Sequence, residues 1–94
     1  MLYIIHSDQD LYKIGISHNP EKRLKQLQTG NGCKLRLYKT YIVKNEAILE
    51  KKIHNMLWQN KAILGKSEWF RLCPETLEWL DEFLNKHLTS NPVY

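Results

Sequence analysis

The fold is decided by Leu2-Tyr3-Ile4-Ile5-His6 and Leu11-Tyr12-Lys13-Ile14-Gly15-Ile16, two apolar runs that the polar Ser7-Asp8-Gln9-Asp10 separates. Apolar, β-branched runs on either side of four turn-forming residues predict a β-hairpin. Asn19-Pro20-Glu21 then has the residue types of a helix start, with an N-cap side chain, a proline at the first helical position and an acid in the first turn. Gly30 is the expected C-cap. The sequence therefore predicts a hairpin that leads directly into a helix.

A third strand is predicted over residues 34–43, where leucine and basic residues alternate before an apolar end. Together with the hairpin it would make a three-stranded antiparallel sheet. Its basic side chains would lie on an outer face of that sheet; they are Lys34, Arg36 and, as a further candidate, Lys39.

The second half of the chain predicts two helices joined by irregular structure. The first runs from about Glu46 to Gln59, with Asn45 as a plausible N-cap. Its buried stripe has helical spacing and consists of Leu49, Ile53, Met56 and Leu57. We expect a loop over 60–67 and a short extended segment over 68–72 that packs its aromatic side chains under the sheet. Pro74 opens the last helix, which has one apolar face.

Length and composition predict one small α/β (α+β) domain over residues 1–88, followed by a C-terminal tail over 89–94. Of the 94 residues 43% are hydrophobic, which is adequate for an independent core. No apolar run approaches the ~20 residues of a membrane span, and no signal peptide precedes the first strand. We therefore expect an intracellular protein without a membrane partner, cytoplasmic or nuclear, and in the host cell for a viral protein.

Positive charge is concentrated in the middle of the chain. The net charge is +4, but residues 11–71 carry thirteen Lys and Arg against four Glu. A basic surface supplies the salt-sensitive, sequence-independent attraction to phosphates that a nucleic-acid enzyme needs. A merely solubilising surface charge is the alternative. The residues expected to contact nucleic acid are Lys22, Lys25, Lys34 and Arg36.

Two cysteines, Cys33 and Cys73, lie forty positions apart without a Cys-x-x-Cys partner. Free thiols are the favoured interpretation, and a zinc site or a redox pair is the alternative.

The hairpin and its helix resemble the start of the GIY-YIG nuclease superfamily. Met1-Leu2-Tyr3 stands where that family has Gly-Ile-Tyr, and Lys13-Ile14-Gly15 where it has Tyr-Ile-Gly. Arg23 follows Gly15 by eight positions, as the family's arginine does. The resemblance covers roughly residues 1 to 72.

The second half fits the same resemblance. Asn45-Glu46-Ala47-Ile48-Leu49-Glu50 is similar to the helix that bears the family's metal-binding glutamate. Glu50-Lys51-Lys52-Ile53-His54 and Gly65-Lys66-Ser67-Glu68-Trp69-Phe70 resemble a small phage- and virus-associated branch, in which lysine commonly replaces the second tyrosine. The resemblance implies a Mg²⁺-dependent endonuclease (Mn²⁺ being an alternative ion) that hydrolyses DNA with one metal ion.

The expected roles combine the resemblance with the chemistry of each side chain. By resemblance, Tyr3 activates the water and Glu50 is the single metal ligand, a hard oxygen donor suited to Mg²⁺. Arg23 can hold two phosphate oxygens, and Lys13 could supply the positive field that makes a phenol a usable base. His54, four after Glu50, either packs at the edge of the core or contacts phosphate or metal. Gly15 is a close-approach glycine in a strand.

The chain departs from the family pattern at three positions. Tyr12 lies one place before Lys13, and its side chain should point to the opposite face of the sheet. Leu27 stands four after the arginine, where relatives often carry His or Tyr, so His18 or His6 would have to substitute. Asn60 is a candidate for the family's late asparagine.

Two other function classes stay open: a nucleic-acid-binding module of the same fold without turnover, and a protein-interaction or inhibitor domain. The expected partner is DNA, and a protein partner could supply specificity. The chain should be a monomer or a weak homodimer, with Trp79 and Phe83 of the last helix as a candidate dimer face.

Overall fold

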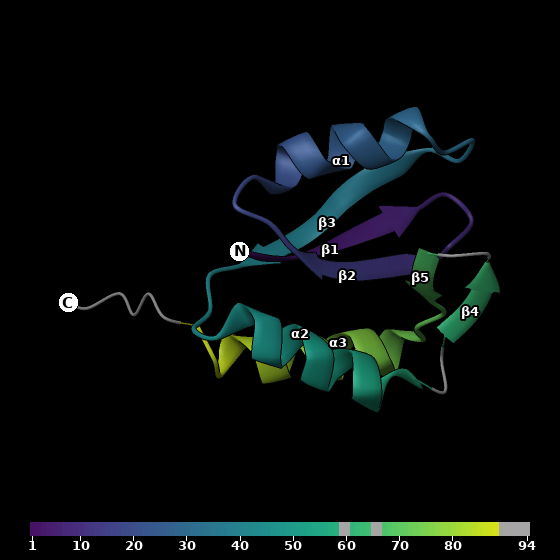
Figure 1. The fold of residues 1–94 in the computed structure, drawn as a ribbon. Helices are drawn as coiled ribbons and strands as arrows, with labels where there is room; N and C mark the ends of the chain where they lie inside the picture. The colour runs from purple at the N-terminus through teal and green to yellow at the C-terminus, as the bar shows by residue number, and fades with distance from the viewer. Residues whose placement is uncertain (59–60, 65–66, 89–94) are drawn as a thin grey trace.

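The chain forms eight elements of secondary structure in the computed structural model, which describes residues 1–58, 61–64 and 67–88. In chain order they are β1 (Leu2–Ser7), β2 (Tyr12–Ile16), α1 (Pro20–Thr29), β3 (Leu35–Tyr41), α2 (Glu46–Met56), β4 (Lys61–Leu64), β5 (Ser67–Phe70) and α3 (Pro74–Asn85), as Figure 1 shows. The predicted tail over 89–94 lies outside the described residues.

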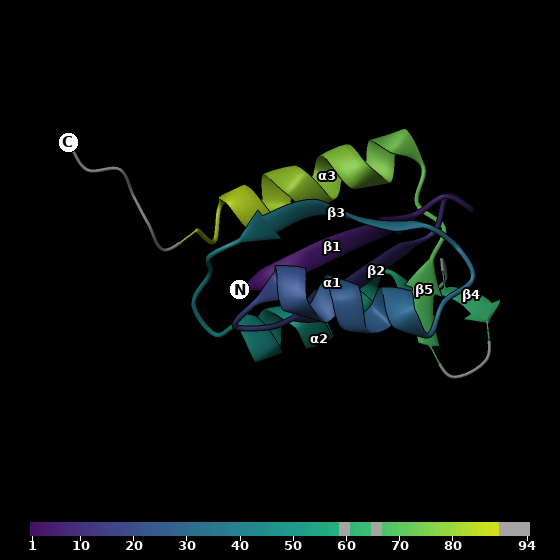
Figure 2. The same cartoon turned by 90° about the horizontal axis from the view of Figure 1, so that it is seen from above.

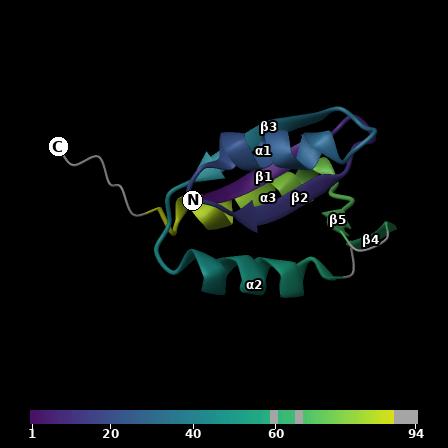
Figure 3. The same ribbon diagram turned by 45° about the horizontal axis from the view of Figure 1, so that its top comes forward.

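The strands form one antiparallel sheet in the order β3-β1-β2-β5-β4. Helix α1 lies lengthwise along one face, whereas α2 and α3 cover the other (Figures 1 and 2). Helix α2 lies on the side of β2, and α3 lies nearer to β3 and β1 (Figures 2 and 3). The predicted class, an antiparallel sheet flanked by helices, is confirmed.

The sheet has five strands among the described residues, rather than the predicted three. Residues 61–64, predicted as loop, pair with β5, and β5 joins β2 through the single partner pair Tyr12–Phe70. Strand β5 lies largely within the extended segment predicted over 68–72, and its aromatic side chains are buried as expected. Strand β4, with only four residues, is too short for an alternating pattern to stand out in the sequence.

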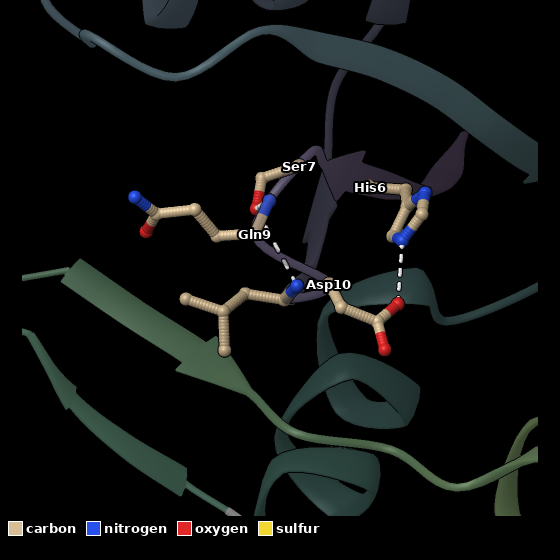
Figure 4. A network of polar contacts seen from close by, with 5 residues as sticks. His6, Ser7, Gln9 and Asp10 are labelled. Atoms are coloured by element: carbon tan, nitrogen blue, oxygen red, sulfur yellow. Dashed lines mark hydrogen bonds and ion pairs between the residues drawn. The ribbon is translucent and has the colours of Figure 1, made fainter.

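The hairpin turn is held by its own polar side chains (Figure 4). The hydroxyl oxygen of Ser7 accepts from the backbone N–H of Gln9 at 3.2 Å and of Leu11 at 3.4 Å. Asp10 has a positive φ of 63°, a conformation that Asp tolerates better than most residues, and its carboxylate accepts from Nε2 of His6 at 2.9 Å. This local chemistry fixes the turn and therefore the register of β1 against β2.

Alternation along the strands separates two apolar cores. The core facing α2 and α3 includes Leu2, Ile4, Ile14, Phe70, Leu80 and Leu84. The core under α1 includes Tyr3, Ile5, Leu11, Leu35 and Trp69, with Leu24 and Leu27 of α1 packed against it. Successive residues of one strand thus serve opposite faces, as the period of two requires.

The helix boundaries confirm most of the sequence prediction. Asn19 caps α1, its Oδ1 accepting from the N–H of Lys22 at 3.1 Å, and Gly30 is the C-cap, although its φ of −97° is not left-handed. Helix α2 begins at Glu46 as predicted, but Asn45 makes no side-chain cap bond.

The predicted stripe of α2 was wrong in one member. Met56, the last residue of the helix, is 41% exposed, while Leu49, Ile53 and Leu57 are buried. Because α2 packs at the side of β2, one residue per turn suffices to cover the sheet there. The helix ends three residues before the predicted Gln59, which lies outside the described residues.

Asp81 attaches α3 to β3. Its Oδ1 accepts from the hydroxyl of the buried Tyr41 at 2.7 Å and from Nζ of Lys39 at 2.9 Å. The hydrogen bond from Tyr41 and that from Lys39 hold the pKa of Asp81 below its ordinary value. Burial, and then the bond to Asp81, raises the pKa of Tyr41. Lys39, the further candidate for a basic outer face, is exposed as expected, but its ammonium group is paired with Asp81.

None of the helices within the described ranges is long and apolar enough to cross a membrane.

We expect Asp81→Asn to lower the free energy of unfolding by about 1 kcal/mol at neutral pH, a value discounted because the carboxylate is partly exposed. A depressed folded-state pKa stabilises the fold above the ordinary aspartate pKa of ~3.9, and this stability is lost as the pH falls through the folded-state value. Urea unfolding at neutral and acidic pH measures it. The control is Glu82→Gln, an exposed neighbouring acid. A deficit of Asp81→Asn that stays the same in acid would contradict the role of the charge.

Candidate active site

One pocket of about 440 Å³ gathers every residue that the sequence predicted to be catalytic. Its lining includes Tyr3, Lys13, Gly15, Arg23, Glu50 and His54. These side chains come from β1, β2, α1 and α2, and the two helices belong to opposite faces of the sheet. The structure thus brings together the predicted catalytic set, across 51 positions of sequence from Tyr3 to His54.

The pocket exists because part of β2 has no neighbouring strand on its outer side. Among the described residues, β5 pairs with β2 only at Tyr12, so residues 13–16 form an open edge. Helix α1 lies on one side of this edge and α2 on the other (Figure 3). An open edge between two helices leaves room for a polar ligand without disrupting either core.

Tyr3 and Gly15 are cross-strand partners in the β1–β2 pair. The ring of Tyr3 lies across Gly15, since a Cβ at position 15 would be 2.6 Å from Cζ of Tyr3. The tyrosine is 3% exposed, yet it lines the pocket. No described polar side-chain atom is both fully buried and without a partner, and Tyr3 has no side-chain hydrogen bond among these residues. The hydroxyl of Tyr3 is therefore open to the pocket.

Glu50 and His54 lie one turn apart on the flank of α2 that faces β2. Nε2 of His54 is 2.8 Å from the carbonyl oxygen of Ile14, and the ring packs edge-on against Phe70. Because a carbonyl can only accept, Nε2 carries the proton, and in a neutral ring Nδ1 is then the basic nitrogen. The Glu50 carboxylate is half-buried and has no hydrogen bond or ion pair with any described residue.

Arg23 extends from the first turns of α1, which the cap at Asn19 and the buried Pro20 place beside β2. Its Nη1 donates to Oε1 of Gln26 at 3.3 Å, and the side chain is exposed. Within the described ranges Arg23 makes no ion pair with Glu50, although both line the same pocket. Neither group is therefore neutralised by the other.

Lys13 lies two positions before Gly15 and so on the same sheet face. Its Nζ is 5.9 Å from the ring centroid of the buried Trp69, within the range of a cation–π interaction. The indole thus helps to hold the ammonium group at the pocket.

The substitute residues considered in the sequence do not line this pocket. Tyr12 points to the opposite face, as expected. There its ring stacks on that of His6, with the ring centroids 4.5 Å apart. Burial and the nearby Asp10 raise the pKa of Tyr12. His18 is exposed, and Leu27 packs into the core under α1. Asn60 lies outside the described residues. His54 is the histidine that the described structure brings to the pocket.

The predicted nucleic-acid contacts fall in two places. Lys22 and Lys25 are exposed on α1, the helix that carries Arg23. Lys34 and Arg36 line a separate cavity of about 250 Å³ at the far end of β3, and the guanidinium of Arg36 lies 5.7 Å from the ring of Tyr38. The sequence could not separate these two places, because charge alone carries no information on distance.

The donor set fits a hard divalent ion better than zinc. The described residues contain no group of three or more His, Cys, Asp and Glu that could hold a metal, and Cys33 and Cys73 are free thiols. A single carboxylate without a protein partner suits Mg²⁺, which keeps several of its waters and completes its shell with substrate phosphate. Glu50 is that carboxylate.

The hydrogen bond between His54 and Ile14 is the feature of the site that sequence reasoning missed. The spacing of Glu50 and His54 indicated a shared flank, but no sequence signal identifies a backbone acceptor forty positions away.

Comparison with known proteins identifies the family of the chain. No curated protein and no solved structure matches the chain. The model of the T5orf172 domain matches residues 1–87, which is nearly the whole chain. The chain therefore belongs to the T5orf172 domain family, a nuclease-associated family.

Proposed function

We propose that this protein is a Mg²⁺-dependent endonuclease of the GIY-YIG type that hydrolyses DNA phosphodiester bonds with one metal ion. The observation that carries the proposal is the single pocket at the open edge of β2, in which Tyr3, Arg23 and Glu50 meet. Membership of a nuclease-associated family supports it.

Glu50 is the residue that would hold the ion, because its carboxylate is uncommitted among the described residues. When bound, Mg²⁺ supplies positive charge that stabilises the phosphate and the leaving oxygen as negative charge develops. A second protein carboxylate is not required for this role, since Mg²⁺ is commonly held by one or two.

Arg23 binds the scissile phosphate in this proposal. Its guanidinium is held only by a long hydrogen bond to a neutral amide, so it can turn to donate two bonds to phosphate oxygens. Phosphate binding here places the phosphorus beside Tyr3, Lys13 and Glu50.

Tyr3 orients the attacking water and, in its ionised form, takes a proton from it; the positive charge of Lys13 lies on the same sheet face. The oxygen of this water forms a bond to phosphorus while the bond from phosphorus to the leaving oxygen breaks. The water-derived oxygen stays on phosphorus, and the leaving oxygen takes up a proton from solvent.

His54 supplies the second proton-transfer group that Leu27 cannot provide. With Nε2–H fixed on the Ile14 carbonyl, Nδ1 is the ring atom at which a proton is exchanged. The backbone hydrogen bond orients the ring in the way that a second partner commonly orients a catalytic histidine.

A nucleic-acid-binding module without turnover is the second candidate. The observation that favours it is Lys13, which replaces a hydroxyl by an ammonium group held at the indole of Trp69. It predicts salt-sensitive DNA binding without any Mg²⁺-dependent product.

We expect wild-type protein to nick supercoiled or branched DNA only with Mg²⁺. Glu50→Gln should lower the nicking rate by roughly 100-fold or more, the scale on which one charge-stabilising group acts. The matched control is Glu21→Gln, an exposed acid of α1 that does not line the pocket. Equal rates for the two variants, or nicking without divalent metal, would refute the assigned metal ligand. If the wild-type protein binds DNA but does not nick it, the second candidate function, a binding module without turnover, replaces the first.

A second variant separates the chemistry of His54 from its structural bond. The amide of His54→Gln can still donate to the Ile14 carbonyl but cannot exchange a proton. We expect a free energy of unfolding close to that of wild type and nicking slowed by ~100-fold or more. His18→Gln, at an exposed histidine outside the pocket, is the control. If His54→Gln nicks as fast as His18→Gln, the proton-transfer role is wrong.

Gly15→Ala tests the contact with Tyr3. Its methyl group would overlap the tyrosine ring, so the ring must shift, at a cost of about 1–3 kcal/mol in the free energy of unfolding and with loss of nicking. Gly32→Ala is the control, because a Cβ there meets nothing within 4 Å. Urea unfolding and the nicking assay measure both effects. Unchanged stability in Gly15→Ala would contradict the close approach.

A further inference from the structure

A second pocket of about 440 Å³, as large as the catalytic one, lies between the start of α2 and the end of α3. Its lining includes Lys44, Ile48 and Lys52 on one side and Lys86, His87 and Leu88 on the other. An antiparallel bridge between Val43 and Leu88 joins the two segments at its base. We call this pocket the basic groove.

All the charged side chains that line the basic groove are basic. Three lysines and a histidine line it, and no acidic residue does. The ion pairs of the described residues involve none of these lysines. Nζ of Lys52 lies 5.8 Å from the ring of Phe83, and His87 donates from Nδ1 to the carbonyl of Phe83 at 2.9 Å. A groove lined by charges of one sign, here positive, attracts anions.

The basic groove and the catalytic pocket lie on opposite flanks of α2. Glu50 and His54 line the catalytic pocket, and Ile48 and Lys52 line the groove. The two residues of each pair are four positions apart and so lie on one side of the helix. The pair at the groove precedes the pair at the catalytic pocket by two positions, which is a rotation of about 200° around the helix. One helix, roughly 10–12 Å across with its side chains, therefore separates the two sites.

We propose that the basic groove binds backbone phosphates of the same DNA whose scissile phosphate occupies the catalytic pocket. This inference rests on the proposed function for the identity of the nucleic acid. Lysine ammonium groups bind phosphates as point charges without reading the base. Ile48, which is 67% exposed, places an apolar surface beside these charges, where a sugar can pack.

Nucleic acid is favoured over a small anion because of the spread of the charges. The lysines come from two helices and surround an open groove rather than converging on one buried point. A polyanion can compensate all of them at once and can pass around α2 to the catalytic pocket. The phosphate contacts would hold DNA in place without being cleaved themselves.

The test compares two double variants with the same reduction in charge. Lys52→Gln with Lys86→Gln removes one lysine from each side of the groove. Lys39→Gln with Arg71→Gln removes two exposed charges that lie outside the groove and away from α2. Binding of a short fluorescein-labelled DNA duplex is measured by anisotropy between ~50 and ~200 mM salt, in EDTA so that no cleavage occurs. Thermal unfolding of both variants verifies that they are folded.

We expect the groove variant to bind roughly 10-fold more weakly at ~0.1 M salt, with the salt slope reduced by about two, because each lysine removed leaves one phosphate without its cation. The affinity of the control variant should fall clearly less. Equally weakened binding in the two variants would overturn the proposal even if wild type nicks DNA. If wild type binds but never nicks, the proposed function fails while the groove result still decides the inference.

A further experiment tests whether the groove binds DNA or free phosphate. Inorganic phosphate replaces chloride at equal ionic strength, and we expect it to displace the duplex no better than chloride does. If phosphate instead raises the unfolding temperature of wild type but not of the groove variant, and DNA binding is equal in both, the groove is a small-anion site and the proposal is wrong.

Discussion

The packing of Tyr3 against Gly15 is the contact on which the rest of the site depends. The two residues are direct partners in the β1–β2 pair, and only glycine leaves room for the ring. A slip of one residue would place a side chain under the ring and would turn every residue of β2 to the other face. The contact therefore fixes which side chains of β2 face α1, and with them the position of Lys13 beside Trp69.

The same short stretch of β2 also connects the site to the opposite face of the sheet. Gly15 serves the face under α1, while the carbonyl of Ile14 accepts from His54 of α2. Two consecutive residues of β2 thus contact groups that belong to the two different cores. This is possible because residues 13–16 have no paired strand on their outer side among the described residues, so the backbone there can bind a side chain.

Local signals made the first half of the fold predictable from sequence. The turn residues, the Asn19 cap and the alternation in the strands all act over a few positions, and each is present in the structure. The family resemblance, through the spacing of its motifs, predicted that Tyr3, Arg23 and Glu50 belong to one site, and in the structure they line one pocket. Neither the local signals nor the resemblance reveals which side chains that are distant in sequence form hydrogen bonds or ion pairs with one another.

The failures that concern strand pairing and charge are long-range. Lys39 pairs with Asp81 across 42 positions, and no sequence signal indicates that this exposed lysine has an acidic partner on α3. The extended segment that forms β5 was predicted, but its pairing with β2 through one residue pair and with β4 was not, because no local signal specifies a distant partner strand. The basic groove is invisible in the sequence, because Lys52 and Lys86 become neighbours only when α3 packs beside α2.

The separation of Arg23 from Glu50 is as informative as their presence in one pocket. They belong to helices on opposite faces of the sheet, and within the described residues they form no ion pair. A direct pair would have neutralised both groups and left little reason for a ligand to enter. Held apart, the guanidinium keeps its affinity for an anion and the carboxylate its affinity for a cation. A phosphate with its bound divalent ion carries both charges side by side, and such a pair can satisfy both groups at once.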